Sequence, residues 1–381
     1  MSDRSTKRES GFSLLEMMIA MALGTIVLGA AVQLYSQGVA ATFTVSQRAE
    51  LQQDFRAASD MLTRDLSLAG SGLGNNVQIA LPTTAMIPVY GCDQSTHCYI
   101  NGSAAAYPTQ SGTPYLYGLI PGQNYGPTLN TSQGPTDVVT VVYTDAGFFL
   151  NCYGVTVTTS TVVQFRLPAT LPPGCVLPSG WTAPQNVNDA VAGLTPGDLV
   201  WFTVTPSITC TGGCTPSVVV AEVTGVTSVN PTTYNVSFAT GDVLKMNQTT
   251  STSANLASVV SYVGSGTRIQ VITYYIDNTI APPRLMRQVS GHAPMPVAEN
   301  VVYLKFSYDL YNSATGTAAP NQADGGASLG LTPNQITKIN ILHMAMNGTV
   351  KGAKGGYQGL DLQTSVSARD LTYSNSYPIG P

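Results

Sequence analysis

Cysteine thiols are the side chains of this 381-residue sequence with the clearest capacity for chemistry, and there are six of them. They fall in three neighbouring couples: Cys92 with Cys98, Cys152 with Cys175, and Cys210 with Cys214. An even number of cysteines grouped in this way favours local disulfides, which form in an oxidising compartment such as the bacterial periplasm or the cell exterior. We therefore treat all six as disulfide candidates, although spacing alone does not fix which thiols pair.

Metal binding and redox catalysis are the competing uses of these thiols. Zinc sites commonly use CxxC couples, which this chain lacks, and of His97, His292 and His343 only the first lies near a cysteine. A redox pair would also need CxxC spacing at a helix start, the arrangement that lowers a thiol pKa. We expect no metal site, and we expect a Cys210 to Cys214 bridge to fix the shape of a tight loop.

The chain carries no recognised catalytic pattern. It has no GxSxG, zincin or P-loop motif. Gly70, Gly72 and Gly74 are spaced somewhat like a dinucleotide loop, but that loop follows a strand and opens a helix, whereas these glycines follow a helical pattern. His343 lies in an apolar run typical of a strand, and we expect it to be a core residue. The sequence predicts a protein that is not an enzyme and binds no cofactor.

The overall composition is polar but weakly charged. Charged residues make up 9% of the chain, against about 25% in typical soluble domains. A hydrophobic content of 43% with a net charge of -4 favours a folded chain over a disordered one. The 16 Lys and Arg residues are scattered and outnumbered by 20 acids, so no basic surface for nucleic acid is expected.

The first apolar segment contains an isolated acid. The run from Phe12 to Tyr35 carries one charge, Glu16, and about 20 apolar residues are enough to cross a bilayer as a helix. The basic residues before it predict a cytoplasmic N-terminus and an exported remainder. The run is longer than the apolar part of a cleaved signal peptide. Because an acid inside the membrane costs about 2.5 to 3.5 kcal/mol, Glu16 needs a cationic partner.

The stretch GFSLLEMMIA, residues 11–20, resembles the prepilin signature of type IV pilins and type II secretion pseudopilins. In that family a basic leader ends in Gly, and an apolar helix follows that starts with Phe and has Glu as its fifth residue. The resemblance implies that prepilin peptidase removes the leader, residues 1–11, between Gly11 and Phe12, and methylates the new amine. It also implies that Glu16 pairs with the N-terminal amine of a neighbouring subunit. Pairing within one chain stays open, because four helical residues rise only about 6 Å.

A helical period continues beyond the membrane segment. Apolar residues step by three or four along one face, and these are Leu51, Phe55, Ala58, Leu62, Leu66 and Ala69. This pattern predicts a helix from Phe12 to Ala69, about 87 Å long, with a transmembrane part at 12–35 and an amphipathic continuation at 36–70. The glycine-rich residues 70–76 end it. The amphipathic part needs a globular head on which to pack.

The remainder, residues 71–381, has the pattern of a β-rich head. Short runs rich in Val, Ile, Thr, Tyr and Phe alternate with Gly, Pro, Asn and Ser clusters. The predicted strands are 137–145, 153–167, 197–205, 217–226, 268–277, 300–310 and 335–346. The fold class is therefore α+β, with one long N-terminal helix packed on a mainly antiparallel sheet. All six cysteines lie within an inserted section at about 80–265.

The C-terminal third resembles the PilW type of minor pilin. The segments YYIDNTIAPPRLMRQV, PVAENVVYLKFSYDL, ITKINILHMAM and SVSARDL follow the order of strands in that family. The final segment contains Arg369-Asp370, where the family commonly has Arg-Asn. The resemblance implies a pilin head.

These resemblances imply a minor pilin that helps to initiate, assemble or cap a type IV pilus. Its expected partners are prepilin peptidase, the inner membrane, and other major and minor pilins that contact its N-terminal helix. Its expected location is the bacterial inner membrane, with a single pass and a periplasmic head, and then the pilus surface. Two alternatives stay open: a tip adhesin whose tyrosine-rich head binds a surface ligand, and a type II secretion pseudopilin.

Overall fold

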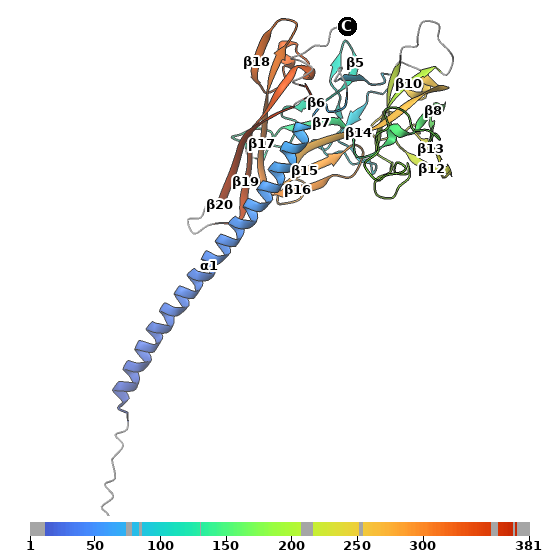
Figure 1. Cartoon of the computed structure of the whole chain (residues 1–381). Coiled ribbons are helices and arrows are strands. Elements are labelled where there is room, and N and C mark those ends of the chain that lie inside the picture. Colours follow the sequence, from blue (N-terminus) through green and yellow to red (C-terminus); the bar gives the residue numbers. More distant parts are fainter. Residues whose placement is uncertain are drawn as a thin grey trace, which may run out of the picture. The chain divides into compact units, whose positions relative to one another are not determined.

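The computed structural model describes residues 12–73, 78–83, 86–129, 131–206, 216–250, 254–351, 357–368 and 370–371. It confirms the expected α+β class, with one long apolar helix and a mostly antiparallel β-rich head (Figure 1). The chain divides into two compact units, one of residues 1–53 and 348–358 and the other of residues 54–347 and 359–381.

Helix α1 spans Leu14–Ser67, two residues shorter at each end than the helix predicted from Phe12 to Ala69. Its last turn tightens, with the amide of Leu68 donating to the Asp65 carbonyl at 3.0 Å. Gly70 then takes a left-handed conformation with φ of 80°, which glycine adopts without steric cost. Within the second unit Ala58, Leu62 and Leu66 are fully buried, and all three belong to the apolar face found in the sequence.

The largest sheet has 11 strands, and its main path runs β11-β10-β14-β8-β9-β13-β12. β6 and β7 join it beside β14, as do β15 and β16. The bounds are β6 Leu119–Gly122, β7 Val138–Thr144, β8 Gly154–Thr159, β9 Val162–Arg166, β10 Leu199–Pro206, β11 Ser217–Glu222, β12 Gly225–Asn230, β13 Thr233–Ser237, β14 Tyr262–Asp277, β15 Arg284–Val289 and β16 Met295–Glu299. Every strand pair with a described register is antiparallel.

Strand β14 connects the two ends of this sheet. Its first half pairs with β10 and β8, and its second half pairs with β7 and β15. The partner strands change at Ile269, which pairs with Leu199 of β10 and with Thr144 of β7. The boundary expected near residue 265 for an inserted section therefore falls inside a single strand.

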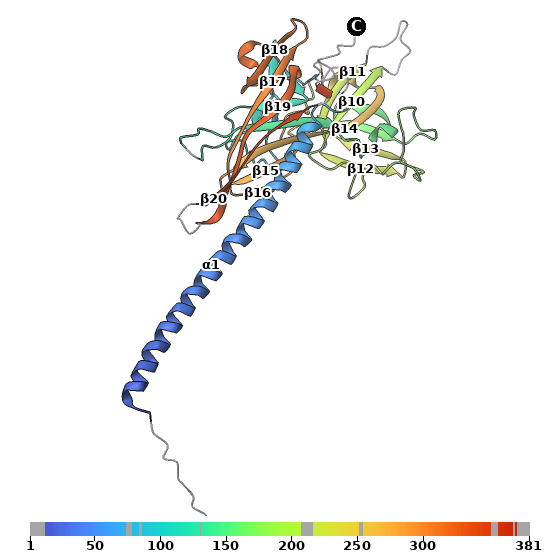
Figure 2. The ribbon, with the colours of Figure 1, turned by 60° about the vertical axis from the view of Figure 1, so that its left-hand side comes forward.

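A second sheet has the order β18-β17-β19-β20. Its strands are β17 Val301–Asn312, β18 Thr317–Gln322, β19 Ile336–Lys351 and β20 Tyr357–Ser367. In both views β17 and β19 lie side by side, away from the end of the larger sheet that holds β10, β12 and β13 (Figures 1 and 2). In β17 the apolar residues Val301, Leu304, Phe306, Tyr308 and Leu310 are buried, and Ser307 is buried between two of them. The register relative to β19 shifts between Val301 and Tyr303.

Smaller elements complete the described head. A three-stranded sheet has the order β1-β5-β4, and β2 pairs with β3. Their bounds are β1 Gln78–Ala80, β2 Val89–Tyr90, β3 Ala105–Ala106, β4 Thr109–Gln110 and β5 Thr113–Tyr117, and the 3-10 turns are η1 Leu150–Cys152, η2 Leu256–Val259, η3 Ala327–Leu329 and η4 Pro333–Gln335.

Two of the predicted strands are in fact pairs of strands. Residues 153–167 form the hairpin β8 and β9, because the polar residues between them make their own hydrogen bonds: the amide of Thr161 donates to Thr159 Oγ1 at 3.2 Å. Residues 217–226 divide between β11 and β12. No glycine or proline marks the turn between β8 and β9, whereas Gly225 stands at the start of β12.

Aromatic rings fill the core beneath β8, β9, β10 and β13. Phe202 lies edge-on to Phe238 at 5.4 Å between ring centroids, and Phe165 lies 6.0 Å from Phe202. A Cβ atom at Gly266 would lie 3.1 Å from the ring of Phe165 and 3.3 Å from that of Phe202. Glycine in the middle of β14 therefore allows these two rings to pack against the strand backbone.

Candidate functional site

The predicted assembly residue, Glu16, lies in the first turn of α1, and the predicted processing residues precede the helix in the sequence. Gly11 lies outside the described residues, while Phe12 follows as an exposed residue with 86% of its surface accessible. The amide of Ser13 donates to Glu16 Oε2 at 3.3 Å, and the amide of Glu16 donates to Ser13 Oγ at 3.2 Å. The carboxylate of Glu16 is thus held beside Ser13, the residue that follows Phe12.

This reciprocal pair is a capping box. The Ser13 side chain accepts from the third residue of the helix, and the Glu16 side chain accepts from the residue that precedes the helix. Both hydrogen bonds satisfy backbone amides that a helix start leaves without partners. The S-x-x-E pattern at 13–16 is a readable signal for this contact. Glu16 therefore has a local role in addition to any role between subunits.

The helix beyond Glu16 presents an apolar surface. An 18-residue window within α1 has a mean hydropathy of 2.0 and none of it is buried, so the helix is long and apolar enough to cross a membrane by length and composition. Exposed large side chains occur all round this part, among them Leu14, Met18, Ile26, Leu34 and Phe43. A helix that is apolar on all sides needs lipid or other helices around it.

A shallow hollow of about 500 Å³ lies along one side of this helix. Gly38 opens it, since a Cβ atom there would meet nothing within 4 Å. Tyr35 and Phe43 stand on either side along the chain. The hydroxyl of Thr42 donates to the Gly38 carbonyl at 2.9 Å, so its polar atom is satisfied within the helix. The hollow can accept a side chain of a neighbouring helix.

Disulfides join two of the three cysteine couples. Cys92 bonds Cys98, with 4.0 Å between their Cα atoms, and Cys152 bonds Cys175, with 4.8 Å. The remaining couple, Cys210 and Cys214, lies outside the described residues.

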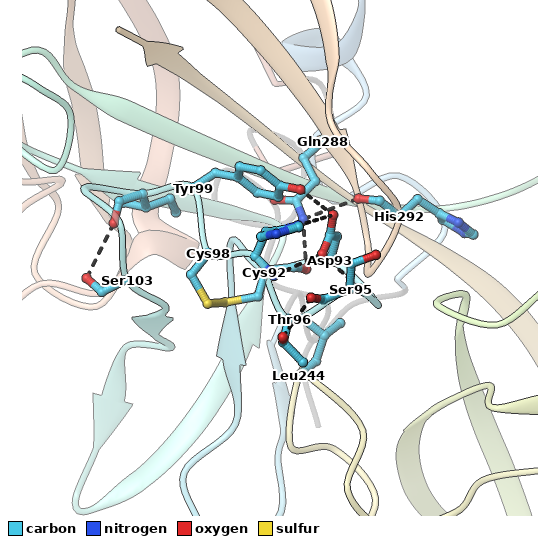
Figure 3. Close-up of a disulfide and its surroundings, with 12 residues drawn as sticks. Cys92, Asp93, Ser95, Thr96, Cys98, Tyr99, Ser103, Leu244, Gln288 and His292 are labelled. Atoms are coloured by element: carbon cyan, nitrogen blue, oxygen red, sulfur yellow. Dashed lines mark hydrogen bonds and ion pairs between the residues drawn. A yellow bond between two sulfur atoms is a disulfide. The ribbon is translucent and has the colours of Figure 1, made fainter. Parts of the chain in front are cut away.

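The Cys92 to Cys98 loop is fixed by polar contacts as well as by its disulfide (Figure 3). Asp93 Oδ1 accepts from the amides of Ser95 at 2.9 Å and His97 at 3.1 Å, and Asp93 Oδ2 accepts from the Tyr99 hydroxyl. Figure 3 shows Tyr99 reaching across the loop to this carboxylate. Gln288 of β15 donates to the Cys92 carbonyl at 2.8 Å, which ties the loop to the large sheet.

The same loop closes over a buried carboxyl pair that sequence analysis did not find. Glu222 is fully buried, and it accepts from the side chain of Gln94 and from the amide of Leu244 at 3.1 Å. It also shares a hydrogen bond with Asp242, whose oxygens accept from two further amides. Burial, followed by the charge of Asp242, raises the pKa of Glu222 to about 8. Glu222 is therefore protonated at neutral pH and donates to Asp242.

The three histidines lie at separate places. His97 is on the disulfide loop, and His292 Nε2 lies 2.9 Å from Asp198 Oδ1. The expectation that His343 is a core residue is wrong, because its side chain is 45% exposed and its Nδ1 lies 2.8 Å from Asp361 Oδ2. A register shift in β19 turns Leu342 and His343 outward. Across the part of the chain that the structure describes, no three His, Cys, Asp or Glu side chains are placed to hold a metal ion.

The C-terminal part of α1 is joined to the large sheet by an ion pair. Asp65 Oδ2 accepts from Arg287 Nε of β15 at 2.8 Å and from the Tyr274 hydroxyl of β14 at 2.7 Å. Burial, followed by the Asp65 carboxylate, raises the pKa of Tyr274, so this hydroxyl stays protonated and donates. Within the second unit, this contact joins the last turns of α1 to β14 and β15.

Comparison with known families decides the nature of the first segment. Residues 6–32 match the family model described as the prokaryotic N-terminal methylation motif. The N-terminal segment is a prepilin methylation motif. It spans Gly11, Phe12, the capping box and the apolar part of α1 as far as Val32. The match supports a type IV pilin-like or pseudopilin-like protein that prepilin peptidase processes, that associates with pilus components, and whose apolar helix fits anchoring in a membrane. No curated protein and no solved structure matches the chain.

Proposed function

We propose that the protein is a minor pilin that helps to initiate, assemble or cap a type IV pilus. The observation that carries this proposal is the methylation motif continuing directly into an exposed apolar helix that is part of a β-rich pilin-like molecule. The helix holds the chain in the inner membrane, with the leader in the cytoplasm and the head in the periplasm, until assembly. This role requires no catalysis.

Glu16 favours one axial register of α1 relative to the helices of neighbouring subunits. The amide and the hydroxyl of Ser13 both donate to Oε2 of Glu16, and Oε1 has no donor among the described residues. Oε1 is thus available to the amine that cleavage creates on Phe12 of a neighbouring subunit. Burying this pair between helices stabilises a single register, because removing one partner of a buried pair costs about 3 to 5 kcal/mol. The hollow at Gly38 offers a second contact for a neighbouring helix.

The size of the head supports a minor role. An 11-stranded sheet and a four-stranded sheet follow the helix. Heads of such size, attached to closely packed helices, would compete for the space around a filament. A position at the tip, or another low-copy position, relieves this competition. A type II secretion pseudopilin is the alternative role for the same helix.

Deletion of the gene in the native host tests the proposal. We expect fewer surface pili by electron microscopy, restored by the wild-type gene and not by a Glu16→Ala gene whose product is still inserted and processed. Normal piliation with a defect in protein secretion would favour the pseudopilin role. Normal piliation and normal secretion would contradict both roles.

A further inference from the structure

A cleft of about 800 Å³ lies in the second unit, and all the described residues that line it follow α1 in the sequence. One wall is formed by residues 106–125, which include β4, β5 and β6, and the other by residues 324–333 between β18 and β19. Its volume is within the range of sites that bind small molecules or short polymers. The two walls approach closely at Gly325, where a Cβ atom would lie 2.3 Å from Pro121 Cγ.

Four tyrosines are among the described residues that line this cleft. Tyr90, Tyr107 and Tyr117 line it but are buried, and the rings of Tyr90 and Tyr107 lie 5.0 Å apart. Tyr125 lines the same cleft but keeps 43% of its surface exposed. Tyr125 is therefore the tyrosine of this set with substantial surface accessible to a ligand, and aromatic rings contribute strongly to binding.

The wall that carries Tyr125 is held in place on both sides of that residue. The amide of Asn124 donates to Asp137 Oδ1 at 2.8 Å, and the Asn124 side chain accepts from Lys305 Nζ at 2.6 Å. The amide of Gly126 donates to the Thr136 carbonyl at 2.9 Å. The backbone at Tyr125 is therefore ordered before any ligand arrives, which lowers the entropic cost of binding.

The opposite wall is ordered by one carboxylate. Asp324 accepts from the amide of Gly326 at 2.9 Å and from that of Ser328 at 2.7 Å. Burial alone would raise the pKa of Asp324, but the hydrogen bonds from Ser328 and Gly326 outweigh it and hold that pKa below its usual value. The Asp324 carboxylate therefore stays ionised, and its oxygens accept hydrogen bonds within the turn.

The charge and polarity of the lining define the ligand class. Among the described residues that line the cleft, Asp324 is the one charged side chain, and Lys, Arg and His are absent. An anionic ligand would find no counter-ion among these residues. The remaining polar groups are neutral hydrogen-bonding side chains at its surface, including Gln110, Gln123 and Thr332. They suit a ligand that is uncharged and rich in hydroxyl groups.

We propose that this cleft binds a neutral oligosaccharide. A sugar ring has an apolar face of C–H groups, which packs on tyrosine, and an edge of hydroxyl groups, which hydrogen-bond to amide and hydroxyl side chains. Tyr125 stacks on the ring, and Gln110 and Gln123 contact its edge. This inference goes beyond the pilin role, since it gives the head a ligand whether or not the chain enters a filament. A proline-rich peptide also suits aromatic grooves, and the experiment below separates the two.

The test uses the full-length protein in a detergent without a sugar head group. Binding is measured by saturation-transfer NMR and calorimetry with lactose, cellobiose, chitobiose and maltotriose as neutral probes, and with sialyllactose and a proline-rich peptide as comparators. We expect at least one neutral probe to bind with millimolar or better affinity. Tyr125→Ala should weaken that binding about tenfold, equivalent to about 1.4 kcal/mol, and Tyr125→Phe should keep most of it.

Trp181→Ala is the matched control. Trp181 is 44% exposed, close to the 43% of Tyr125, and is not among the residues that line the cleft. This variant should bind as the wild type does, and circular dichroism should show all variants folded. Binding by none of the neutral probes would overturn the proposal. So would equal binding by Tyr125→Ala, or preferential binding of sialyllactose or the peptide.

Discussion

Asp65 accepts a hydrogen bond from Arg287 Nε at 2.8 Å, across a sequence separation of 222 residues. The Asp65 side chain is 6% exposed and that of Arg287 is 26% exposed. Through this ion pair the last turns of α1 are fixed to β15 of the large sheet.

Replacing Asp65 should destabilise the head. In Asp65→Asn the partly buried guanidinium of Arg287 loses its counter-ion, and we expect the free energy of unfolding to fall by about 3 kcal/mol. This is the low end of the range for broken buried pairs, because Arg287 keeps some contact with water. Urea unfolding of the full chain in detergent measures the change. Asp60→Asn on the exposed side of the same helix should change it by less than about 0.5 kcal/mol; equal effects would argue against the pair.

Two variants separate the local role of Glu16 from its role between subunits. Ser13→Ala removes the hydroxyl of the capping box but keeps the charge of Glu16, whereas Glu16→Gln keeps an acceptor for the Ser13 amide and removes the charge. If the charge pairs with a neighbouring amine, Glu16→Gln should be recovered in sheared filaments at about one tenth of the wild-type amount or less. Ser13→Ala, which loses about 1 kcal/mol of cap stability, should be recovered nearly as well as the wild type.

Quantitative immunoblotting of sheared filaments and of membranes reads out both variants. Similar membrane levels show that insertion is unaffected. A loss in Ser13→Ala with normal recovery of Glu16→Gln would mean that the capping box, not the charge, is what assembly needs.

The buried carboxyl of Glu222 should make stability depend on pH. Its pKa is raised to about 8 in the folded chain, above the value near 4.3 expected when unfolded. The folded state therefore binds more protons between these values, and stability from this group is greatest at low pH and is lost as pH rises through about 8. The slope is at most about 1.4 kcal/mol per pH unit.

Glu222→Gln provides the comparison, because a neutral amide can still donate to Asp242 and accept from Leu244. We expect its unfolding free energy to change less between pH 5.5 and pH 8 than that of the wild type. Some dependence on pH should remain, because burial also raises the pKa of Asp242. Chemical unfolding at the two pH values measures this difference. The same slope in both proteins would assign the pH dependence to other groups.

The two described disulfides should contribute unequally to stability. Cys152 and Cys175 are 23 residues apart and Cys92 and Cys98 are 6 apart, and loop-closure entropy predicts about 3 kcal/mol for the longer loop and about 2 kcal/mol for the shorter. Denaturation of the two paired Cys→Ser variants under non-reducing conditions tests the order. A larger loss for the shorter loop would show that its contacts, such as that of Gln94 with Glu222, outweigh the entropy term.

Features carried by consecutive residues were predictable from the sequence. The period that ends at Ala69 and the apolar run after Phe12 predict α1 to within two residues at each end. The cysteine couples predict the described pairings because each couple is close along the chain. The capping box is also encoded locally, by Ser13 and Glu16 at the spacing S-x-x-E.

Features built from distant residues were not predictable in this way. Gln94 and Glu222 are 128 residues apart, and no period or motif in a single sequence links them. The cleft likewise joins Tyr125 to the turn at Asp324 through the packing of separate sheets. Local shifts of register, such as the one that exposes His343, also depend on the partner strand rather than on the strand itself.

The most direct test of the proposed function is mass spectrometry of the N-terminal peptide, from membranes and from sheared surface filaments of the native host. A chain that begins at methylated Phe12 and is present in both fractions is the predicted result. An intact Met1, or cleavage at another bond, would contradict processing by prepilin peptidase and with it the pilin role. Correct processing with absence from the filament fraction would contradict incorporation into the pilus.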